Sequence, residues 1–179
     1  MPRLFFGLEI PAQIKTRLLE VRAEVPGAKW QSVEQMHLTL SFLGDVEEER
    51  LTAVCEAARH IPQAPFELSV LGLGCFGQAC APRNLWASVQ PVAPVASLHN
   101  AIKGQMESLG LTTASRAFRP HITLSRFTRQ PGSVEGLLAE YGETAFGSFQ
   151  VDQFVVFESK QGSGGSVYTV IKRFPSIGL

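Results

Sequence analysis

The stretches HLTLS (residues 37–41) and HITLS (residues 121–125) repeat one pattern, His-x-Thr-Leu-Ser with an aliphatic residue at x, and decide the reading of the fold. Each alternates apolar and polar residues, which predicts a β-strand. Positions i and i+2 of a strand project from the same face, so the His and Thr of each stretch point the same way. With four histidines and nine threonines, roughly 0.2 His-x-Thr pairs are expected by chance.

The predicted elements around the two stretches follow one order twice: strand, helix, His-x-Thr strand, helix, strand. RLFFGLEIP (3–11) and RNLWASVQP (83–91) begin the two series and match in their first and last residues. In the first series we expect strands at 3–10, 36–43 and 66–73. Its helices run from after Pro11 to Pro26-Gly27 and over 47–60. In the second series we expect strands at 83–90 and 121–125, a helix that Gly110 terminates, and a helix at 132–141. This order predicts two lobes related by a pseudo-twofold axis.

The C-terminal region reads as a β-hairpin. Residues 154–159 and 166–174 are rich in β-formers, and GSGG (162–165) forms the loop between them. We expect one domain over residues 1–179, with an α+β fold of two lobes. In each lobe an antiparallel sheet faces a central cleft, and helices lie outside.

The composition narrows the class of protein. The 179 residues are 45% hydrophobic and carry no formal net charge, which argues against gripping long nucleic acid through counterion release. We expect no membrane span, because the apolar runs are too short. Three cysteines without a CxxC pair indicate reduced thiols and therefore a cytoplasmic protein. We also expect a monomer. Cys75 and Cys80 lack a completing ligand set, so we expect no metal and no cofactor.

Two strands side by side would direct two imidazoles and two hydroxyls into one cleft. This set suits a phosphodiester, because hydrolysis needs a base for water and an acid for the leaving alkoxide. Near neutral pH one imidazole can be neutral and the other protonated. The hydroxyls can donate hydrogen bonds to the non-bridging phosphate oxygens. His60 and His99 lack the following Thr, and we interpret both as surface residues.

The sequence resembles the two-histidine phosphoesterase superfamily, whose mark is a pair of HxT motifs. More narrowly, it is similar to bacterial LigT-like RNA 2′,3′-cyclic phosphodiesterases. The matching segments span nearly the whole chain: RLFFGLEIP (3–11), WQSVEQMHLTLSFLG (30–44), RPHITLSRF (119–127) and FESKQGSGGSVYTVIKRFP (157–175).

The resemblance implies the bilobal α+β fold and hydrolysis of a terminal 2′,3′-cyclic phosphate to a 2′-phosphate, with RNA ends or small cyclic nucleotides as substrates. It implies that His37 is the proton donor to the 3′ oxygen and His121 the proton acceptor from water. It also implies that Thr39, Thr123 and Arg126 bind the phosphate. Some members join RNA halves through a 2′–5′ linkage, so a ligase side activity is an open alternative.

The position of Arg126 conflicts with strict alternation. Counting from His121, it falls on the opposite face of the strand. It reaches the phosphate only if the strand twists, bulges or ends there. Arg119 shares the parity of His121 and is a lesser candidate.

Three aromatic residues are candidates for the cleft. Phe42 and Phe6 could stack on a base, but we favour packing in the strand core for both. Tyr168 is a candidate at the rim. Although core packing is favoured for Phe42, we keep it, together with Tyr168, as a candidate substrate contact.

Two further functions stay open. One keeps the fold and acts on 2′–5′ oligonucleotides or an ADP-ribose cyclic phosphate, and a substrate panel separates it from the first. The other is a non-catalytic module that binds nucleotides or RNA ends, which predicts binding without turnover.

Overall fold

The computed structural model describes residues 1–62, 64–111, 113 and 117–175, and its fold is α+β. The strands are β1 (Arg3–Glu9), β2 (Ala28–Trp30), β3 (His37–Asp45), β4 (Phe66–Gln78), β5 (Ala81–Gln90), β6 (His121–Phe127), β7 (Ala145–Val151), β8 (Phe154–Gly162) and β9 (Gly165–Phe174). The helices are α1 (Ala12–Leu19), α2 (Glu48–Arg59), α3 (Val92–Ser108) and α4 (Glu135–Tyr141), with a short 3₁₀ helix η1 (Val33–Gln35). In the described part of the chain, no helix is long and apolar enough to span a membrane.

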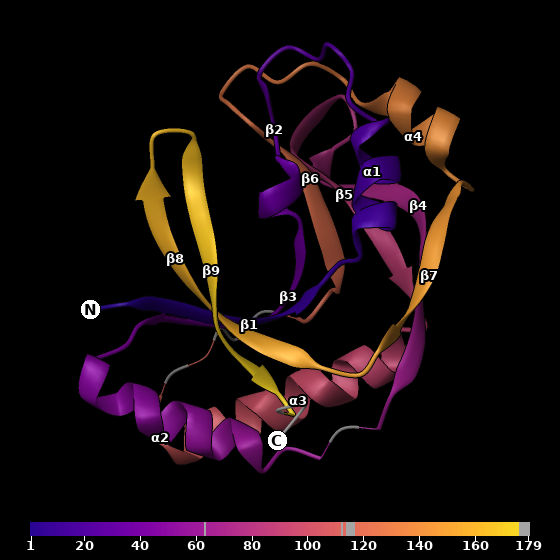
Figure 1. Cartoon of the computed structure of the whole chain (residues 1–179). Coiled ribbons are helices and arrows are strands. Elements are labelled where there is room, and N and C mark those ends of the chain that lie inside the picture. The colour runs from indigo at the N-terminus through magenta and orange to yellow at the C-terminus, as the bar shows by residue number, and fades with distance from the viewer. Residues whose placement is uncertain (63, 112, 114–116, 176–179) are drawn as a thin grey trace.

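The strands form a curled antiparallel sheet in the order β7-β4-β5-β6-β3-β1-β8-β9, with β2 added to β6 (Figure 1). At its centre, β3 and β6 are joined by one residue pair, Leu38 with Ile122. The sheet thus has two half-sheets, β7-β4-β5-β6 and β3-β1-β8-β9. This confirms the α+β class and the repeated order of elements.

The half-sheets do not coincide with the two sequence repeats. Strand β4 closes the first repeat but pairs with β5 of the second, and β8 returns to pair with β1. The helices also change sides: α1 contacts β7, α4 contacts β4, and α2 packs on α3, as Figure 1 shows. Each half of the sequence therefore completes the lobe of the other.

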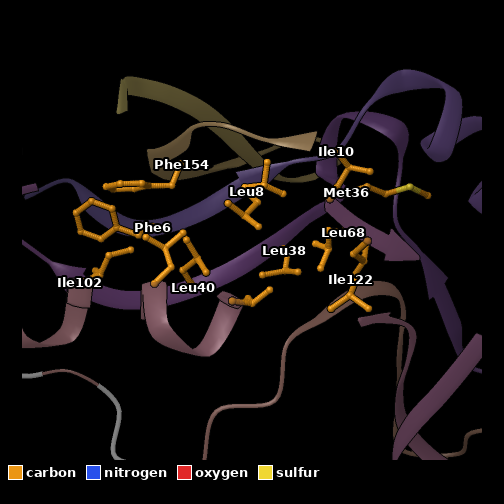
Figure 2. Close-up of a cluster of buried hydrophobic side chains, with 14 of the residues drawn as sticks. Phe6, Leu8, Ile10, Met36, Leu38, Leu40, Leu68, Ile102, Ile122 and Phe154 are labelled. Atoms are coloured by element: carbon orange, nitrogen blue, oxygen red, sulfur yellow. The ribbon is translucent and has the colours of Figure 1, made fainter. Parts of the chain in front are cut away.

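The main core lies between the sheet and the helices. Phe6 and Leu8 on β1, Leu38 on β3 and Ile122 on β6 are all at most 1% exposed (Figure 2). Burying such side chains stabilises the fold by about 1.5–3 kcal/mol each. Apolar packing in the core therefore stabilises the contact between the half-sheets and keeps β3 and β6 side by side.

A smaller apolar cluster lies outside this core, beneath the β8–β9 hairpin. It contains Phe5, Val155 and Phe157, and Tyr168 and Val170 pack against it. Phe5 and Phe157 stack with ring centroids 4.9 Å apart. This cluster forms a wall beside the start of β3.

The structure corrects several expected boundaries. The helix after Pro11 ends at Leu19, well before Pro26-Gly27, and residues 20–22 continue as tight turns with i to i−3 bonds. The chain runs on without helix through residues 22–25, and the segment after Pro26-Gly27 extends to form β2 on β6. Strands β2 and β7 are not predicted from the sequence. The other strands, the hairpin and the helix stop at Gly110, which has φ +79°, are confirmed, but β4 runs on to Gln78, past the predicted end at 73, and α4 begins at Glu135 and not at 132.

Candidate active site

The pairing of Leu38 with Ile122 fixes the geometry of the site. Both side chains are 0% exposed and point into the core. Their neighbours along each strand therefore point to the opposite face, toward the cleft. The core contact thus sets the register of the polar residues above it.

In an antiparallel pair, the residue after one partner faces the residue before the other. Thr39 therefore lies across from His121, and His37 lies across from Thr123. All four are half-buried. The structure thus brings together the two His-x-Thr pairs that the sequence singles out, alternating His and Thr around one small area.

The same backbone contact orients both imidazoles. Nδ1 of His37 is 2.8 Å from the carbonyl oxygen of Gln35, and Nδ1 of His121 is 2.6 Å from that of Arg119. A carbonyl only accepts, so Nδ1 carries the hydrogen and Nε2 of the neutral ring is an acceptor. Nε2 of His37 lies 2.9 Å from the Thr39 hydroxyl, which donates to it. Both rings are thereby preset to exchange protons at Nε2.

Aromatic rings enclose His37. Phe5 and Phe157 lie at centroid distances of 4.9 and 5.7 Å, and Tyr168 meets the imidazole edge-on at 4.9 Å. The candidate contact Tyr168 therefore lies beside His37. These rings remove water from one side of the imidazole.

His121 has its own aromatic neighbours in the other half-sheet. Phe76 on β4 meets it edge-on at 5.0 Å, and Trp86 on β5 lies at 5.7 Å. Trp86 pairs with Thr123 across β5 and β6. Each imidazole is thus held between its own strand and rings from neighbouring strands.

Burial and nearby positive charge make both imidazoles hard to protonate. The pKa of His37 is lowered to about 4, chiefly by burial; the Gln35 carbonyl contact opposes this, and the charges of Arg126, His121 and Lys15 contribute to the lowering. Burial also lowers the pKa of His121, and the charge of Arg126 adds to that effect. A bound anion would raise the pKa of both imidazoles again, because it favours their protonated forms.

A β-bulge brings Arg126 to the cleft face. Along β6, Thr123 pairs with Trp86 but Ser125 pairs with the adjacent Leu85, so Leu124 is the extra residue. Leu124 and Ser125 are both buried, so Arg126 points outward on the same face of the strand as His121. The bulge removes the conflict that strict alternation predicts.

The equivalent bulge in β3 overturns the core interpretation of Phe42. Gly7 pairs with Thr39 while Phe6 pairs with Ser41, which leaves Leu40 as the extra residue. Ser41 is buried, and Phe42 is 55% exposed on the cleft face. The core interpretation is confirmed for Phe6, which is 0% exposed.

A pocket of about 640 Å³ opens beside Thr39 and His121. Its lining comprises Thr39, Leu40, Ser41, Phe42, Phe76, Arg83, His99, Ala117, Phe118, Arg119 and His121. Arg119, the lesser candidate of the sequence, lies in this lining. Sequence reasoning missed Phe76, Arg83 and Phe118, which reach the pocket only through the folding of β4, β5 and the segment before β6.

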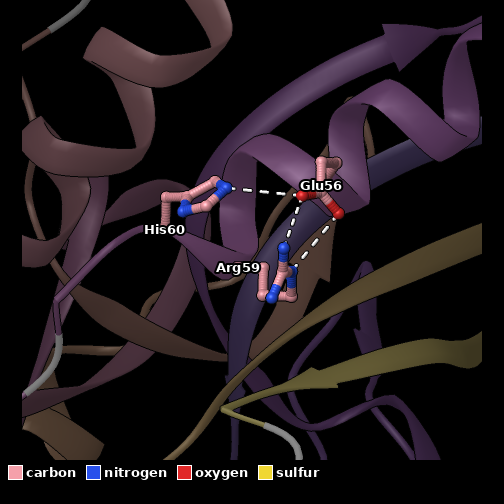
Figure 3. Close-up of polar contacts among 3 residues, drawn as sticks. All are labelled: Glu56, Arg59 and His60. Atoms are coloured by element: carbon pink, nitrogen blue, oxygen red, sulfur yellow. Dashed lines mark hydrogen bonds and ion pairs between the residues drawn. The ribbon is translucent and has the colours of Figure 1, made fainter.

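The surface interpretation of His99 is wrong. Nδ1 of His99 lies 2.6 Å from the carbonyl oxygen of Leu40, and its ring stacks on Phe118 at 4.1 Å, within 5° of parallel. His60 does lie at the surface as predicted. It follows α2, and its Nε2 is 3.3 Å from the Glu56 carboxylate, which also pairs with Arg59 (Figure 3).

Potential metal ligands are scattered. Within residues 1–62, 64–111, 113 and 117–175, no group of three or more His, Cys, Asp or Glu side chains is placed to hold a metal ion. The three cysteines are free thiols. The motif residues and Arg126 offer imidazole, hydroxyl and guanidinium groups.

Comparison with known proteins agrees with an α+β fold of two repeated halves. The model of the family described as LigT like Phosphoesterase matches residues 8–86 and again residues 88–168. The chain therefore belongs to the LigT-like phosphoesterase family. The double match also reflects the internal repeat.

Several relatives and solved structures are similar over almost the full chain. Proteins named RNA 2′,3′-cyclic phosphodiesterase are 28% identical in Archaeoglobus fulgidus (96% of this chain, 99% of the relative) and 31% identical in Escherichia coli K12 (96% and 95%). A crystal structure from Thermus thermophilus superposes with a TM-score of 0.81 at 27% identity, covering 96% of both chains. E. coli LigT complexed with 3′-AMP gives 0.78 at 28% identity, covering 97% of this chain and 98% of that one.

Proposed function

We propose that this protein hydrolyses a terminal 2′,3′-cyclic phosphate on RNA to a 2′-phosphate by acid–base catalysis that needs no metal. The observation that carries the proposal is the pairing of Leu38 with Ile122, which sets Thr39 across from His121 and His37 across from Thr123. The names of the relatives support the choice of substrate.

The reaction begins at His121. Its neutral Nε2 takes a proton from water as the water oxygen forms a bond to phosphorus. The bond between phosphorus and the 3′ oxygen breaks, and the protonated Nε2 of His37 gives its proton to that oxygen. The products are a 2′-phosphate and a free 3′ hydroxyl. Each positioned group typically contributes about 10²–10⁴-fold to the rate.

The low pKa of His37 supports its role as the acid. A protonated imidazole with a lowered pKa gives up its proton readily, and the pKa of His37 is lowered to about 4. The phosphate anion supplies the charge that favours protonation of His37. His121 keeps an acceptor Nε2, because its Nδ1 faces the Arg119 carbonyl.

Thr39, Thr123 and Arg126 would hold the phosphate. Two hydroxyls can donate hydrogen bonds to the non-bridging oxygens, and the guanidinium balances the charge that develops there. Arg126 suits this task because the bulge turns it to the cleft face, and its charge reaches both imidazoles.

The test is a product assay in EDTA. An oligoribonucleotide ending in a 2′,3′-cyclic phosphate is incubated with the wild type and with His37→Ala, His121→Ala and His60→Ala. We expect conversion to the 2′-phosphate, a loss of at least about 10²-fold in each site variant, and no change for His60→Ala. His60 is a matched control because its side chain is 62% exposed just after the end of α2, away from the cleft.

Other products would redirect the proposal. A 3′-phosphate would keep the two-histidine chemistry and make the 2′ oxygen the leaving group. Binding of the cyclic end without turnover would replace the enzyme with a binding module, whereas turnover only of other cyclic or 2′–5′ phosphodiesters would change the substrate. Adding an RNA with a 5′ hydroxyl tests the ligase side activity in the same assay.

A further inference from the structure

Positive charge is concentrated in one part of this formally neutral chain. Residues 68–134, which form most of β4 together with β5, α3 and β6, hold six of the 16 basic residues and one of the 16 acidic residues. The part of the fold that carries His121 is therefore basic. A local excess of one sign of charge raises the concentration of the oppositely charged ligand there.

Lys29 on β2 adds a cation to this part of the fold. It pairs with Arg126 across β2 and β6 (Figure 1), and directly opposed residues project from the same face of a sheet. Its neighbours Ala28 and Trp30 are half-buried, whereas Lys29 is exposed. Lys29 therefore stands beside Arg126 on the cleft face.

This pair of cations has a cost in the fold. Like charges directly opposite each other destabilise a sheet. Among the residues that the structure describes, no carboxylate forms an ion pair with Lys29 or Arg126. Lys15, whose charge also reaches His37, differs in having the carboxylates of Glu9 and Glu34 near it. The pair of Lys29 and Arg126 therefore suits an anionic ligand.

The two cations stand at different distances from the imidazoles. Besides burial, the charge of Arg126 lowers the pKa of both imidazoles, and Lys29 is not among the charges that act on either of them. Along β6, Thr123 lies across from His37, and the pair of Arg126 and Lys29 follows it. Lys29 therefore lies beyond the proposed position of the reacting phosphate, on the His37 side.

The chemistry of the ribose directs the rest of an RNA strand the same way. The 3′ carbon of the ring adjoins the carbon that carries the 5′ group, whereas the 2′ carbon adjoins the carbon that carries the base. The proposed mechanism places the 3′ oxygen at His37. The phosphodiester on the 5′ side of the terminal nucleotide therefore leaves the site past His37, toward Lys29.

We propose that Lys29 binds the first phosphodiester on the 5′ side of the cyclic phosphate, so that an RNA strand is preferred to a mononucleotide. Arg126 holds the reacting phosphate, and Lys29 holds the next one. The inference rests on the proposed function, which fixes the position of the 3′ oxygen. It extends that function from the cyclic phosphate to the strand that carries it.

The test compares three product-like ligands by calorimetry. They are adenosine 2′-phosphate, the dinucleotide ApA ending in a 2′-phosphate, and the same dinucleotide with an uncharged methylphosphonate linkage, both dinucleotides having a 2′-O-methyl group on the first ribose. We expect the wild type to bind the charged dinucleotide roughly 2- to 10-fold more tightly than the uncharged one, the range for one exposed charge-assisted contact.

Salt should separate the two dinucleotides as well. The logarithm of the binding constant should fall with the logarithm of the salt concentration more steeply for the charged dinucleotide, by about 0.7, the value for one phosphate contact to a single strand. Lys29→Ala should lose both differences and bind adenosine 2′-phosphate as before.

Two further variants serve as controls. Lys29→Arg keeps the charge and should keep the preference. Lys172→Ala removes the same charge from β9, where Lys172 faces α2 beside Cys55 and Glu56, and should also keep it.

Three results would overturn the inference. They are equal binding of the two dinucleotides by the wild type, a preference that survives in Lys29→Ala, and an equal loss of affinity for adenosine 2′-phosphate, which would assign Lys29 to the reacting phosphate. Failure of the proposed function appears separately, as absent hydrolysis of the cyclic end by the wild type.

Discussion

The indole ring of Trp86 lies directly over Gly74, so close that a Cβ added at Gly74 would overlap it. The two residues pair across β4 and β5, and Trp86 in turn contacts His121. We expect Gly74→Ala to push the indole toward His121. The free energy of unfolding should fall by about 1–3 kcal/mol, the usual cost of overpacking. Urea denaturation measures the change in the free energy of unfolding, and the hydrolysis assay measures the effect of the displaced indole on His121.

Gly104 provides the control for this substitution. It lies within α3, and a Cβ added there meets nothing within 4 Å. Gly104→Ala should raise the free energy of unfolding by up to about 1 kcal/mol through helix propensity and leave hydrolysis unchanged. A Gly74→Ala variant as stable and active as Gly104→Ala would show that the indole is not confined.

The sequence predicts the elements whose signal is local. The His-x-Thr strands follow from alternation over five residues, and their repetition predicts the two related halves. Alternation fails at the bulges after Thr39 and Thr123, because one extra residue inverts the parity of all that follow. Counting along the strand therefore misplaces Phe42 and Arg126.

Residues that reach the pocket through long-range contacts leave no local signal. His99 bonds to the carbonyl of Leu40, which is 59 positions away, and its own helix reads as ordinary. The pairing of β4 with β5 and of β8 with β1 likewise joins strands from different halves of the sequence, and no local pattern predicts it. Hydrophobic periodicity predicts that a segment is a strand, but it does not say which strand lies beside it.

The lowered pKa values predict an acid-shifted pH profile. The proposed mechanism needs His37 protonated and His121 neutral, and kcat/KM reports the free enzyme. It should be highest between about 4, the pKa of His37, and the pKa of His121, which lies below its ordinary 6.5. It should fall as pH rises further, because His37 loses its proton.

The profile of kcat should differ from that of kcat/KM. The bound phosphate anion raises the pKa of both imidazoles, so the alkaline limb of kcat should lie at higher pH. Initial rates from about pH 4 to 9 at saturating and limiting substrate measure both limbs. A kcat/KM that keeps rising above about pH 7.5 would contradict the assignment of His37 as the acid.

Arg126 is predicted to act on both the phosphate and the imidazoles. Arg126→Ala removes a positive charge that lowers the pKa of His37 and His121, so both values should rise. Inorganic phosphate should bind more weakly, because the charge-assisted hydrogen bonds are lost. NMR titration of the imidazole protons, with and without phosphate, measures both changes. Arg129→Ala, at an exposed position beyond β6, is the control and should leave them unchanged.

Gln35 is predicted to position His37 and the β8–β9 hairpin together. Its side-chain amide donates to the Ser166 carbonyl at 3.0 Å, its Oε1 accepts from the Ser32 backbone at 3.0 Å, and its own carbonyl accepts from His37. Gln35→Met keeps the length of the side chain and removes both of its bonds. We expect a loss of about 1 kcal/mol in the free energy of unfolding.

The effect on function should exceed that of an ordinary lost hydrogen bond. Freed from Gln35, the hairpin should exchange its backbone amides faster and hold Tyr168 less firmly against His37, and kcat/KM should fall by up to about tenfold. Gln153→Met is the matched control, because its amide donates to the Pro175 carbonyl at 2.9 Å, outside the site. Since both variants lose an amide-to-carbonyl bond, a loss of stability alone would appear in both. Because Gln153 and Pro175 lie at the base of the same hairpin, amide exchange is compared near its tip, around Ser166. Only a positioning role predicts that exchange at the tip and kcat/KM change in Gln35→Met and stay constant in Gln153→Met.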